Sequence, residues 1–454
     1  MAHSHYIPAY IFPFLFHFQE VRVKQFFLFC FCVGLFALAL GSSTNARAGG
    51  FQLNDHNARA VAMCFAVVTA DGADASTLFY NPAGMSLLKN GLHLTIGGTL
   101  LMPGARFTGL TTQNSFKTTA MQQWNFPLPH AYAVYKLESG LAFGVGLFVP
   151  FGAGTRWDEN WTGRNLAIRT YIETITINPN ISYAFADNKI AISGGVTYSI
   201  GKAQLQNRVI NFAPEPFLNL EGSGSAISWN AGIIAEPVTG LRIGAAYRHN
   251  INMKYDGNAK FTLDAAGTQP LTGGLNNLFA DGPGGTALNL PFDLRTGISY
   301  RFSEKFMAEI GFDYVGWSSY DTLRVNFNKA PGAPRKADGT DNPGVVINPR
   351  NYSNAPTFRA GVEFTATDAL KLRAGAYYDV VPVDAQFTQP ILPDANRIGV
   401  SIDTGVKIND AISVDAGYLF VYGLQREVKG STFGFDGVYN SWANIASVSL
   451  TCRF

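Results

Sequence analysis

The sequence has little charge. Asp, Glu, Lys and Arg make up 15% of its 454 residues, whereas a soluble domain carries about 25%. The 34 basic and 32 acidic residues leave a net charge of +2, which provides no basic surface of the kind that binds nucleic acid. The hydrophobic share of 47% excludes a disordered chain. These numbers favour a folded protein that covers much of its surface with something other than charge.

Long apolar helices, cysteine pairs and catalytic motifs are also lacking. Beyond residue 50, no apolar run approaches the ~20 residues that a membrane helix needs. Only Cys64 and Cys452 lie outside the N-terminal apolar run, and we expect both thiols to be free. The histidines have no metal-ligand spacing, and no phosphate-binding loop or nucleophile motif is present. Nothing in the sequence argues for an enzyme, and we predict no cofactor and no metal site.

The N-terminus has the features of an export signal. Residues 26–40 form a short apolar run that follows two basic residues and precedes a small-x-small ending at Ala48. This pattern predicts a secretory signal peptide over residues 1–48. An uncleaved anchor helix is the alternative, but the run is short for a membrane span. The extra aromatic block before the run suggests an over-long N-terminus, with translation starting near Val21 or Val23.

Alternation of apolar and polar residues dominates the rest of the chain, as in residues 174–185, 292–302 and 370–379. A period of two gives a strand one apolar and one polar face. Tight turns alternate with seven long loops, at roughly 103–127, 153–167, 208–224, 264–290, 328–352, 385–395 and 429–438.

The segments between these connections number 14, an even count. Short turns at one end and long loops at the other are typical of outer-membrane barrels. The sequence therefore predicts an all-β fold, a 14-stranded antiparallel transmembrane β-barrel over residues 91–454. A secreted β-sandwich also alternates, but it rarely has every strand about 10–12 residues long.

The last segment ends on an aromatic residue. Residues 440–454 alternate, with Trp442, Cys452 and Phe454 on one face, so Cys452 is expected to face lipid. A final strand that ends on Phe resembles the recognition signal of bacterial outer-membrane barrels. We therefore expect the barrel assembly machinery to be a partner during biogenesis, and the outer membrane to be the location.

Four segments carry a resemblance to a known family. They are Phe51-Gln52-Leu53, Asn81-Pro82-Ala83-Gly84, residues 143–157 (FGVGLFVPFGAGTRW) and residues 390–397 (PILPDANR). In this order they resemble the FadL/TodX family of outer-membrane transporters for hydrophobic compounds. One departure is the sequence at residues 63–66, Met-Cys-Phe-Ala, where family hatches usually have Gly-x-Gly-Ala.

The resemblance implies an organisation and a mechanism. Residues 49–90, which lack alternation, would form an N-terminal hatch that plugs the lumen. Hydrophobic ligands would be captured passively at extracellular loops, pass to a lumen pocket and leave sideways through a gap in the barrel wall. The implied residues are Asn81, Pro82, Ala83 and Gly84 for the hatch signature, Phe51 and Leu53 for the pocket, and Pro150, Phe151 and Gly152 for the lateral opening. Proline and glycine weaken strand pairing, which fits an opening there.

Apolar residues also cluster in the expected long loops. Phe212, Phe217, Leu275 and Phe279 are the candidates for substrate capture, because exposed apolar patches often mark binding surfaces. The alternative is that they pack against one another as a small loop core. Both interpretations stay open.

Alternation places ten charged residues inside the barrel: Arg248, Arg295, Arg359, Arg373, Arg397, Glu309, Asp313, Glu363, Asp379 and Asp415. For most of them we expect a bracing role between barrel and hatch. Arg397 is our candidate partner for a substrate carboxylate, because charge-assisted hydrogen bonds are strong. Lys202 has the alternation of the lipid side.

The functional expectation is passive transport of long-chain fatty acids by a monomer surrounded by outer-membrane lipid and lipopolysaccharide. A transporter of aromatic hydrocarbons from the same family is the first alternative. A general porin for polar solutes is the second, although such a channel needs neither a plug nor apolar loops. An outer-membrane hydrolase would need a nucleophile, a base and an orienting group, and no such set is recognisable.

Overall fold

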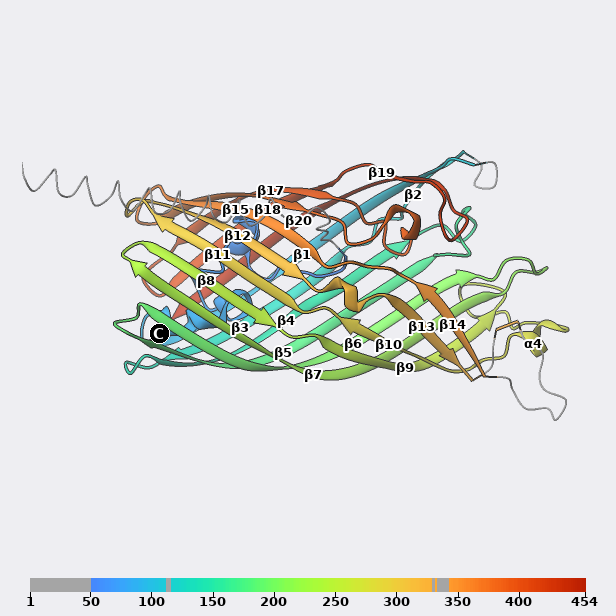
Figure 1. Ribbon diagram of the computed structural model, residues 1–454, viewed down its shortest axis with the longest axis horizontal. Coiled ribbons are helices and arrows are strands. Elements are labelled where there is room, and N and C mark those ends of the chain that lie inside the picture. The colour runs from blue at the N-terminus through green and yellow to red at the C-terminus, as the bar shows by residue number, and fades with distance from the viewer. Residues whose placement is uncertain (1–49, 112–115, 329–330, 333–342) are drawn as a thin grey trace, which may run out of the picture.

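The computed structural model describes residues 50–111, 116–328, 331–332 and 343–454 (Figure 1). The expected signal peptide, residues 1–48, lies outside the described residues. Fourteen antiparallel wall strands close into a barrel, which confirms the predicted fold class. Closure comes from the pairing of the first and last strands, from His93 opposite Arg453 to Gly109 opposite Gly437. No helix in the described part of the chain is long and apolar enough to cross a membrane.

The wall strands follow one another around the barrel. The first six are β1 (Gly91–Gly109), β3 (Phe126–Lys136), β4 (Leu141–Arg156), β5 (Arg169–Phe185), β6 (Ile190–Arg208) and β7 (Phe217–Val238). The next four consist of two pieces each: β8 (Leu241–Arg248) with β9 (Ile251–Thr262), β10 (Gly282–Leu290) with β11 (Asp293–Arg301), β12 (Phe306–Val315) with β13 (Thr322–Phe327), and β14 (Gly344–Pro349) with β15 (Ala355–Thr365). The last four are β16 (Leu370–Asp379), β17 (Arg397–Lys407), β18 (Ile412–Gly423) and β20 (Gly437–Arg453).

Shorter elements lie in the connections and inside the barrel. The short strands are β2 (Thr118–Ala120) and β19 (Arg426–Val428), and the helical turns are α2 (Ala58–Ala62), α3 (Thr77–Tyr80), η1 (Pro82–Leu87), α4 (Leu275–Leu278), η3 (Trp317–Ser319) and η4 (Ala385–Phe387). Residues 50–90, here called the N-terminal segment, lie within the barrel (Figure 1). In this segment α2 packs against β16, β17, β18 and β20, whereas η1 packs against β3 to β7.

The two faces of the wall strands differ as the alternation predicted. In β5, Ile175, Ile177 and Ile181 are exposed on the outer face, whereas the intervening Thr174 and Thr176 are buried. An apolar outer face suits lipid, and polar inner side chains find hydrogen-bond partners in the interior. Both described cysteines are free, as predicted.

Several expected loop boundaries were wrong. β1 continues to Gly109 through a stretch expected as loop, Phe217 begins β7 rather than lying in a loop, and β10 and β14 lie inside the stretches expected as loops 264–290 and 328–352. Antiparallel main chains pair equally well beyond the lipid layer. Side chains there no longer need one apolar face, so alternation marks only the part of each hairpin that crosses the membrane.

Candidate functional site: a lumen cavity beside an unpaired stretch of wall

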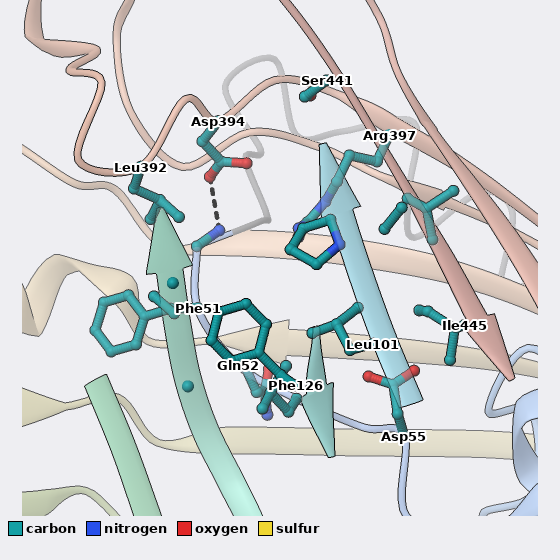
Figure 2. Close-up of a pocket in the computed structure, with 18 of the residues that line it drawn as sticks. Phe51, Gln52, Asp55, Leu101, Phe126, Leu392, Asp394, Arg397, Ser441 and Ile445 are labelled. Atoms are coloured by element: carbon teal, nitrogen blue, oxygen red, sulfur yellow. Dashed lines mark hydrogen bonds between the residues drawn. The ribbon is translucent and has the colours of Figure 1, made fainter. Parts of the chain in front are cut away.

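A cavity of about 310 Å³, here called the central cavity, lies between the N-terminal segment and the wall (Figure 2). Its apolar lining includes Phe51, Leu53, Leu101, Phe126, Leu128 and Ile445. Its polar lining includes Asp55, Arg359, Asp379, Asp394 and Arg397. The cavity can therefore hold an apolar molecule while presenting charges at a few places.

Phe51 and Leu53, both predicted pocket residues, line this cavity from the N-terminal segment. The ring of Phe51 is buried, and it makes edge contacts with Trp317 at 4.9 Å and Tyr320 at 5.5 Å between centroids. Leu53 packs against Val149 of β4. Apolar packing of this kind contributes most of the free energy that holds such a segment in place.

The main chain of the same residues pairs with β4. The Leu53 N–H donates to the Pro150 carbonyl at 2.9 Å, and the Gly152 N–H donates to the Phe51 carbonyl at 2.9 Å. Gln52 stands opposite Phe151 in an antiparallel bridge. Residues 51–53 thus occupy a position where a neighbouring wall strand would normally lie.

The edge of β4 is free at this point because the wall pairing stops. The β3–β4 ladder ends at Ala131 opposite Leu147. The β4–β5 ladder shifts register between Phe148 and Phe151. Proline cannot donate a ladder hydrogen bond, and Pro127, Pro129 and Pro150 all lie along the two separated edges.

The central cavity extends to the outer face at this unpaired stretch. Tyr171 and Glu173 line the cavity, and both share the outward alternation of Ile175. Farther toward the loops, the edges meet again where the Gln122 N–H donates to the Arg156 carbonyl at 2.7 Å. Sequence reasoning located Pro150, Phe151 and Gly152 but missed Pro127 and Pro129, whose spacing on one strand was the available signal.

The arginines of the central cavity already have carboxylate partners. Arg397 Nε donates to Asp379 Oδ2 at 3.0 Å, and Arg359 Nε donates to Asp313 Oδ2 at 2.8 Å. Arg397, our predicted carboxylate partner, therefore lines the cavity within an ion pair. All ten charged residues expected inside the barrel lie in the interior or line it, and eight of the ten are buried.

Two further carboxyl groups of the cavity lie outside the wall strands. Asp394 Oδ2 accepts a hydrogen bond from the Gly50 N–H at 2.6 Å (Figure 2). Burial raises the pKa of Asp394 to about 6, and burial also raises the pKa of Asp55 to about 6. With Asp379, three aspartates line a cavity that has two arginines.

Asn81, Pro82, Ala83 and Gly84 form a tight turn that ties the N-terminal segment to β7. The Asn81 side chain accepts from the Ala83 N–H at 3.2 Å and donates to the Ile233 carbonyl at 3.1 Å. Pro82 begins η1, where a missing N–H costs nothing. A Cβ atom at Gly84 would lie 2.2 Å from Thr77 Oγ1, so only glycine fits there.

The predicted capture residues lie together at the loop end of the barrel. Phe279 belongs to one apolar cluster and Phe212 and Leu275 pack against it, with the rings of Phe212 and Phe279 4.9 Å apart between centroids. Phe217 begins β7 beside this cluster, and the guanidinium of Arg208 lies over its ring. Phe217 and Phe279 are buried, as a loop core requires. The cluster also shares Leu220 and Leu323 with a second cavity.

That second cavity, here called the loop-side cavity, measures about 80 Å³ and includes Leu205, Leu220, Leu288, Leu323 and Val325 in its lining. A third space of about 20 Å³, the junction cavity, is lined by residues that also line its neighbours: Phe51, Ile172 and Leu392 from the central cavity, and Tyr320, Arg350 and Ile391 from the loop-side cavity. The three spaces form a row from the loops to the unpaired wall. Among the described residues, no group of His, Cys, Asp and Glu could hold a metal ion.

A closed barrel with an apolar outer face, an occupied interior and a cavity at a break in its wall defines a membrane transport protein of the outer-membrane β-barrel class. Comparisons with known proteins agree. The family model described as outer membrane protein transport protein (OMPP1/FadL/TodX) matches residues 39–454. The chain is 26% identical over 429 residues to a 47 kDa outer membrane protein of Pasteurella multocida, covering 90% of this chain and 95% of the relative.

Other similar proteins include a fatty acid transport protein, a FadL homologue and a toluene transporter. A long-chain fatty acid transport protein of Escherichia coli O6:H1 is 23% identical, with 88% of this chain and 94% of the relative covered. A FadL homologue of Pseudomonas aeruginosa shares the fold with a TM-score of 0.77 at 20% identity, covering 89% of this chain and all of the homologue. The toluene transporter TbuX of Ralstonia pickettii gives a TM-score of 0.63 at 15% identity, with 91% and 100% covered.

The chain belongs to the OMPP1/FadL/TodX family of outer-membrane transport proteins. It is an outer-membrane protein, as predicted, and membership supports the transport of hydrophobic compounds. Members of the family are transporters rather than enzymes.

Proposed function

We propose that this protein carries long-chain fatty acids across the outer membrane by passive diffusion through its lumen and out through the wall. The observation that carries the proposal is the pairing of residues 51–53 with β4 at the place where β4 has lost its wall partner. A mobile element on an unpaired edge can uncover that edge when it moves, without any energy source.

The route begins at the proposed capture residues Phe212, Phe217, Leu275 and Phe279, where an apolar chain can leave water. Three of them, Phe212, Leu275 and Phe279, belong to or pack against the loop cluster. It continues through the loop-side and junction cavities to the central cavity. It ends between β3 and β4, beside Pro150, Phe151 and Gly152. Lipopolysaccharide hinders direct partition of apolar solutes, and a water-filled pore gives them no favourable path, so an apolar route is what such solutes need.

In this proposal residues 49–90 are the hatch, and their anchoring turn at Asn81, Pro82, Ala83 and Gly84 stays fixed. Only the stretch around Phe51 and Leu53 has to move to open the route. Arg397 contributes to the cavity as a charged wall residue bound to Asp379. The protein acts as a monomer, because the whole route runs within one barrel.

The test uses cells that lack their own transporter and carry this protein or its Pro150→Ala/Gly152→Ala variant. Alanine at position 150 restores a main-chain donor, and alanine at position 152 meets Leu53 Cδ1 at 2.8 Å, so the unpaired stretch should close or bind the hatch differently. We expect uptake of labelled oleate to fall to the level of empty cells in the variant. Pro179→Ala in the middle of β5 is the matched control and should leave uptake unchanged.

Labelled toluene and small sugars separate the alternatives. Uptake of toluene without oleate would assign the protein to the hydrocarbon carriers of the family. Uptake of sugars alone would favour a general porin, which the filled interior argues against. Oleate uptake that survives in the double variant would contradict exit through the wall.

A further inference from the structure

A groove of about 1090 Å³, here called the outer groove, crosses the lipid-facing surface of the wall. Its lining comes from six neighbouring wall strands: β16, β17, β18, β20, β1 and β3. The side chains that line it point outward and are mostly apolar, among them Leu100, Pro127, Pro129, Ile402, Tyr418 and Val448. The outer groove therefore lies outside the lumen and is a different space from the three interior cavities.

The pairing register shows that the outer groove runs across the strands at one level of the barrel. Tyr418 stands opposite Ile402 of β17 on one side and Ala446 of β20 on the other. Ala446 in turn stands opposite Leu100 of β1, and Leu100 stands opposite Pro127 of β3. Neighbouring strands are about 4.8 Å apart, so six strands give the groove a length of about 24 Å. This length suits an extended long alkyl chain.

Small residues form the floor of the outer groove. On β1, Gly98 lies between the exposed side chains of Ile96 and Leu100, and Ala416 and Ala446 are the small outward residues of β18 and β20. A Cβ atom at Gly98 would have no other atom within 4 Å. The space above Gly98 is therefore open, and a larger side chain there would fill the groove without disturbing the wall.

The β3 end of the outer groove adjoins the unpaired stretch of wall. Pro127 and Leu128 line both the outer groove and the central cavity. On the side of β4 these residues have no ladder partner, because the β3–β4 ladder ends at Ala131. Leu53 of the N-terminal segment packs with Leu128, the residue that the two spaces share. A chain that passes the unpaired stretch therefore enters the outer groove directly.

Membrane lipid is the alternative occupant, and the direction of the groove disfavours it. Lipid chains run on average along the membrane normal, whereas barrel strands tilt by about 35–45°, so a groove across the strands is oblique to those chains. A lipid chain also gains little by leaving a bilayer that is as apolar as the groove. A substrate tail differs, because a headgroup in the central cavity would hold the tail beside the groove as part of one molecule.

We propose that the outer groove binds the apolar tail of a substrate that leaves through the wall. The proposal rests on the transport function proposed above and adds a binding site on the lipid-facing surface. The tail passes Pro127 first and settles over Gly98, and the headgroup follows once the tail is surrounded by apolar atoms. The site takes a single extended alkyl chain, because its floor is narrow and crosses one row of small residues.

The test is photo-labelling in whole cells that lack their own transporter, with a long-chain fatty acid that carries a diazirine at the end of its chain. Mass spectrometry of the purified protein maps the labelled residues. The cells carry wild type, Gly98→Phe, Gly194→Phe or the Pro150→Ala/Gly152→Ala variant, and uptake of labelled oleate is measured in parallel. The shift in gel migration between heated and unheated samples shows that each variant is folded.

Two of these variants are controls. Gly194 is an outward-facing glycine of β6 outside the lining of the outer groove, where a Cβ atom would meet only the Asn230 carbonyl oxygen, at 4.0 Å. Gly194→Phe therefore adds the same ring to the lipid-facing surface at another place. The Pro150→Ala/Gly152→Ala variant, whose exit should be closed, separates fatty acid that has passed through the lumen from fatty acid that has entered the bilayer directly.

We expect wild type to be labelled at Ala416 and Ala446 of the outer groove and in the central cavity. Gly98→Phe should lower labelling of the outer groove at least about tenfold and slow oleate uptake at least about threefold, because the ring occupies the space of the chain. Gly194→Phe should resemble wild type. The Pro150→Ala/Gly152→Ala variant should show no labelling of the outer groove.

Several outcomes would overturn the proposal. Labelling of the outer groove that persists when the exit is closed would make chains from the bilayer the occupants, and labelling spread evenly over the outer face would mean that the groove binds no chain selectively. Unchanged uptake by folded Gly98→Phe would place the groove off the route. Labelling of the central cavity alone would overturn the groove and leave the transport function standing, whereas folded wild type with neither labelling nor oleate uptake would contradict the transport function itself.

Discussion

Glu363 joins parts of the chain that are far apart in sequence. Its carboxylate accepts hydrogen bonds from Arg59 Nε at 3.2 Å, Lys371 Nζ at 2.7 Å and Arg373 Nε at 2.8 Å. Arg59 belongs to the N-terminal segment, whereas the other two residues belong to β16. This buried carboxylate therefore holds the N-terminal segment to the wall at a point remote from residues 51–53, the stretch that the proposed mechanism requires to move.

Replacing the charge should loosen that anchor. Glu363→Gln leaves three cations without their shared counter-charge, and breaking a buried ion pair from one side costs about 3–5 kcal/mol. We expect the free energy of unfolding, measured by urea titration of the barrel in lipid vesicles, to fall by that amount. Glu304→Gln, in an exposed turn, is the matched control and should change it little.

A stability of Glu363→Gln equal to wild type would mean that packing alone holds the N-terminal segment in place.

For single charged residues, the sequence predicted which side chains point into the barrel but not which residues they pair with. Alternation placed Glu363, Arg373 and Asp415 inside, whereas Arg59, which pairs with Glu363, lies in a segment without any alternation. Arg350 escaped prediction altogether, because the break in its strand removed the pattern on which the prediction of strands depended.

The element that decides the proposed route is β4. Its wall pairing stops beside three prolines, and a three-residue stretch of the N-terminal segment takes the vacant edge. The break at Pro150 could be predicted from sequence, since proline lacks the donor that a ladder needs. The replacement partner could not, because main-chain pairing over three residues leaves no periodic signal.

If residues 51–53 move during transport, a covalent bond between them and β4 should prevent that movement and so block uptake. Gln52 and Phe151 form a non-hydrogen-bonded pair of an antiparallel bridge. The Cα atoms of such a pair are about 4.5 Å apart. That spacing lies within the range that a disulfide can bridge. We expect Gln52→Cys/Phe151→Cys to take up oleate when reduced and to lose uptake when oxidised.

The two single cysteine variants are the controls, and oxidation should not change their uptake. The native Cys64 interferes little, because it is buried, burial raises its pKa to about 11, and the thiolate form that reacts is scarce. Rapid oleate uptake by the fully cross-linked protein would show that the route opens without movement of residues 51–53.

At the scale of the whole molecule, the barrel separates two kinds of surface. The outer face carries exposed apolar side chains where the strands cross the membrane, and the interior concentrates charges in ion pairs. Composition and alternation predicted this separation and the number of strands, because both follow from the contrast between lipid and an aqueous or polar interior. The cavities could not be predicted, since each is lined by residues from many strands whose relative height depends on the stagger of the closed barrel.

The charge balance of the central cavity gives the route a pH dependence. Asp55 and Asp394 have pKa values raised to about 6 by burial, so both are ionised at pH 7.5 and largely neutral at pH 5. Because these pKa values exceed the value of an unfolded Asp, the folded state binds protons more tightly, and these two groups add to stability as pH falls through 6. Neutralising them also removes two negative charges that repel an anionic ligand.

We therefore expect a long-chain alkyl sulfonate, which stays anionic across this range, to bind about three- to tenfold more tightly at pH 5 than at pH 7.5, because two repulsive charges are lost. Asp55→Asn/Asp394→Asn should bind it equally at both pH values and as tightly as wild type does at pH 5. Hexadecanol, which has no charge, should show no pH dependence with either protein. Equal affinity of wild type for the sulfonate at the two pH values would mean that the anionic group does not approach these aspartates.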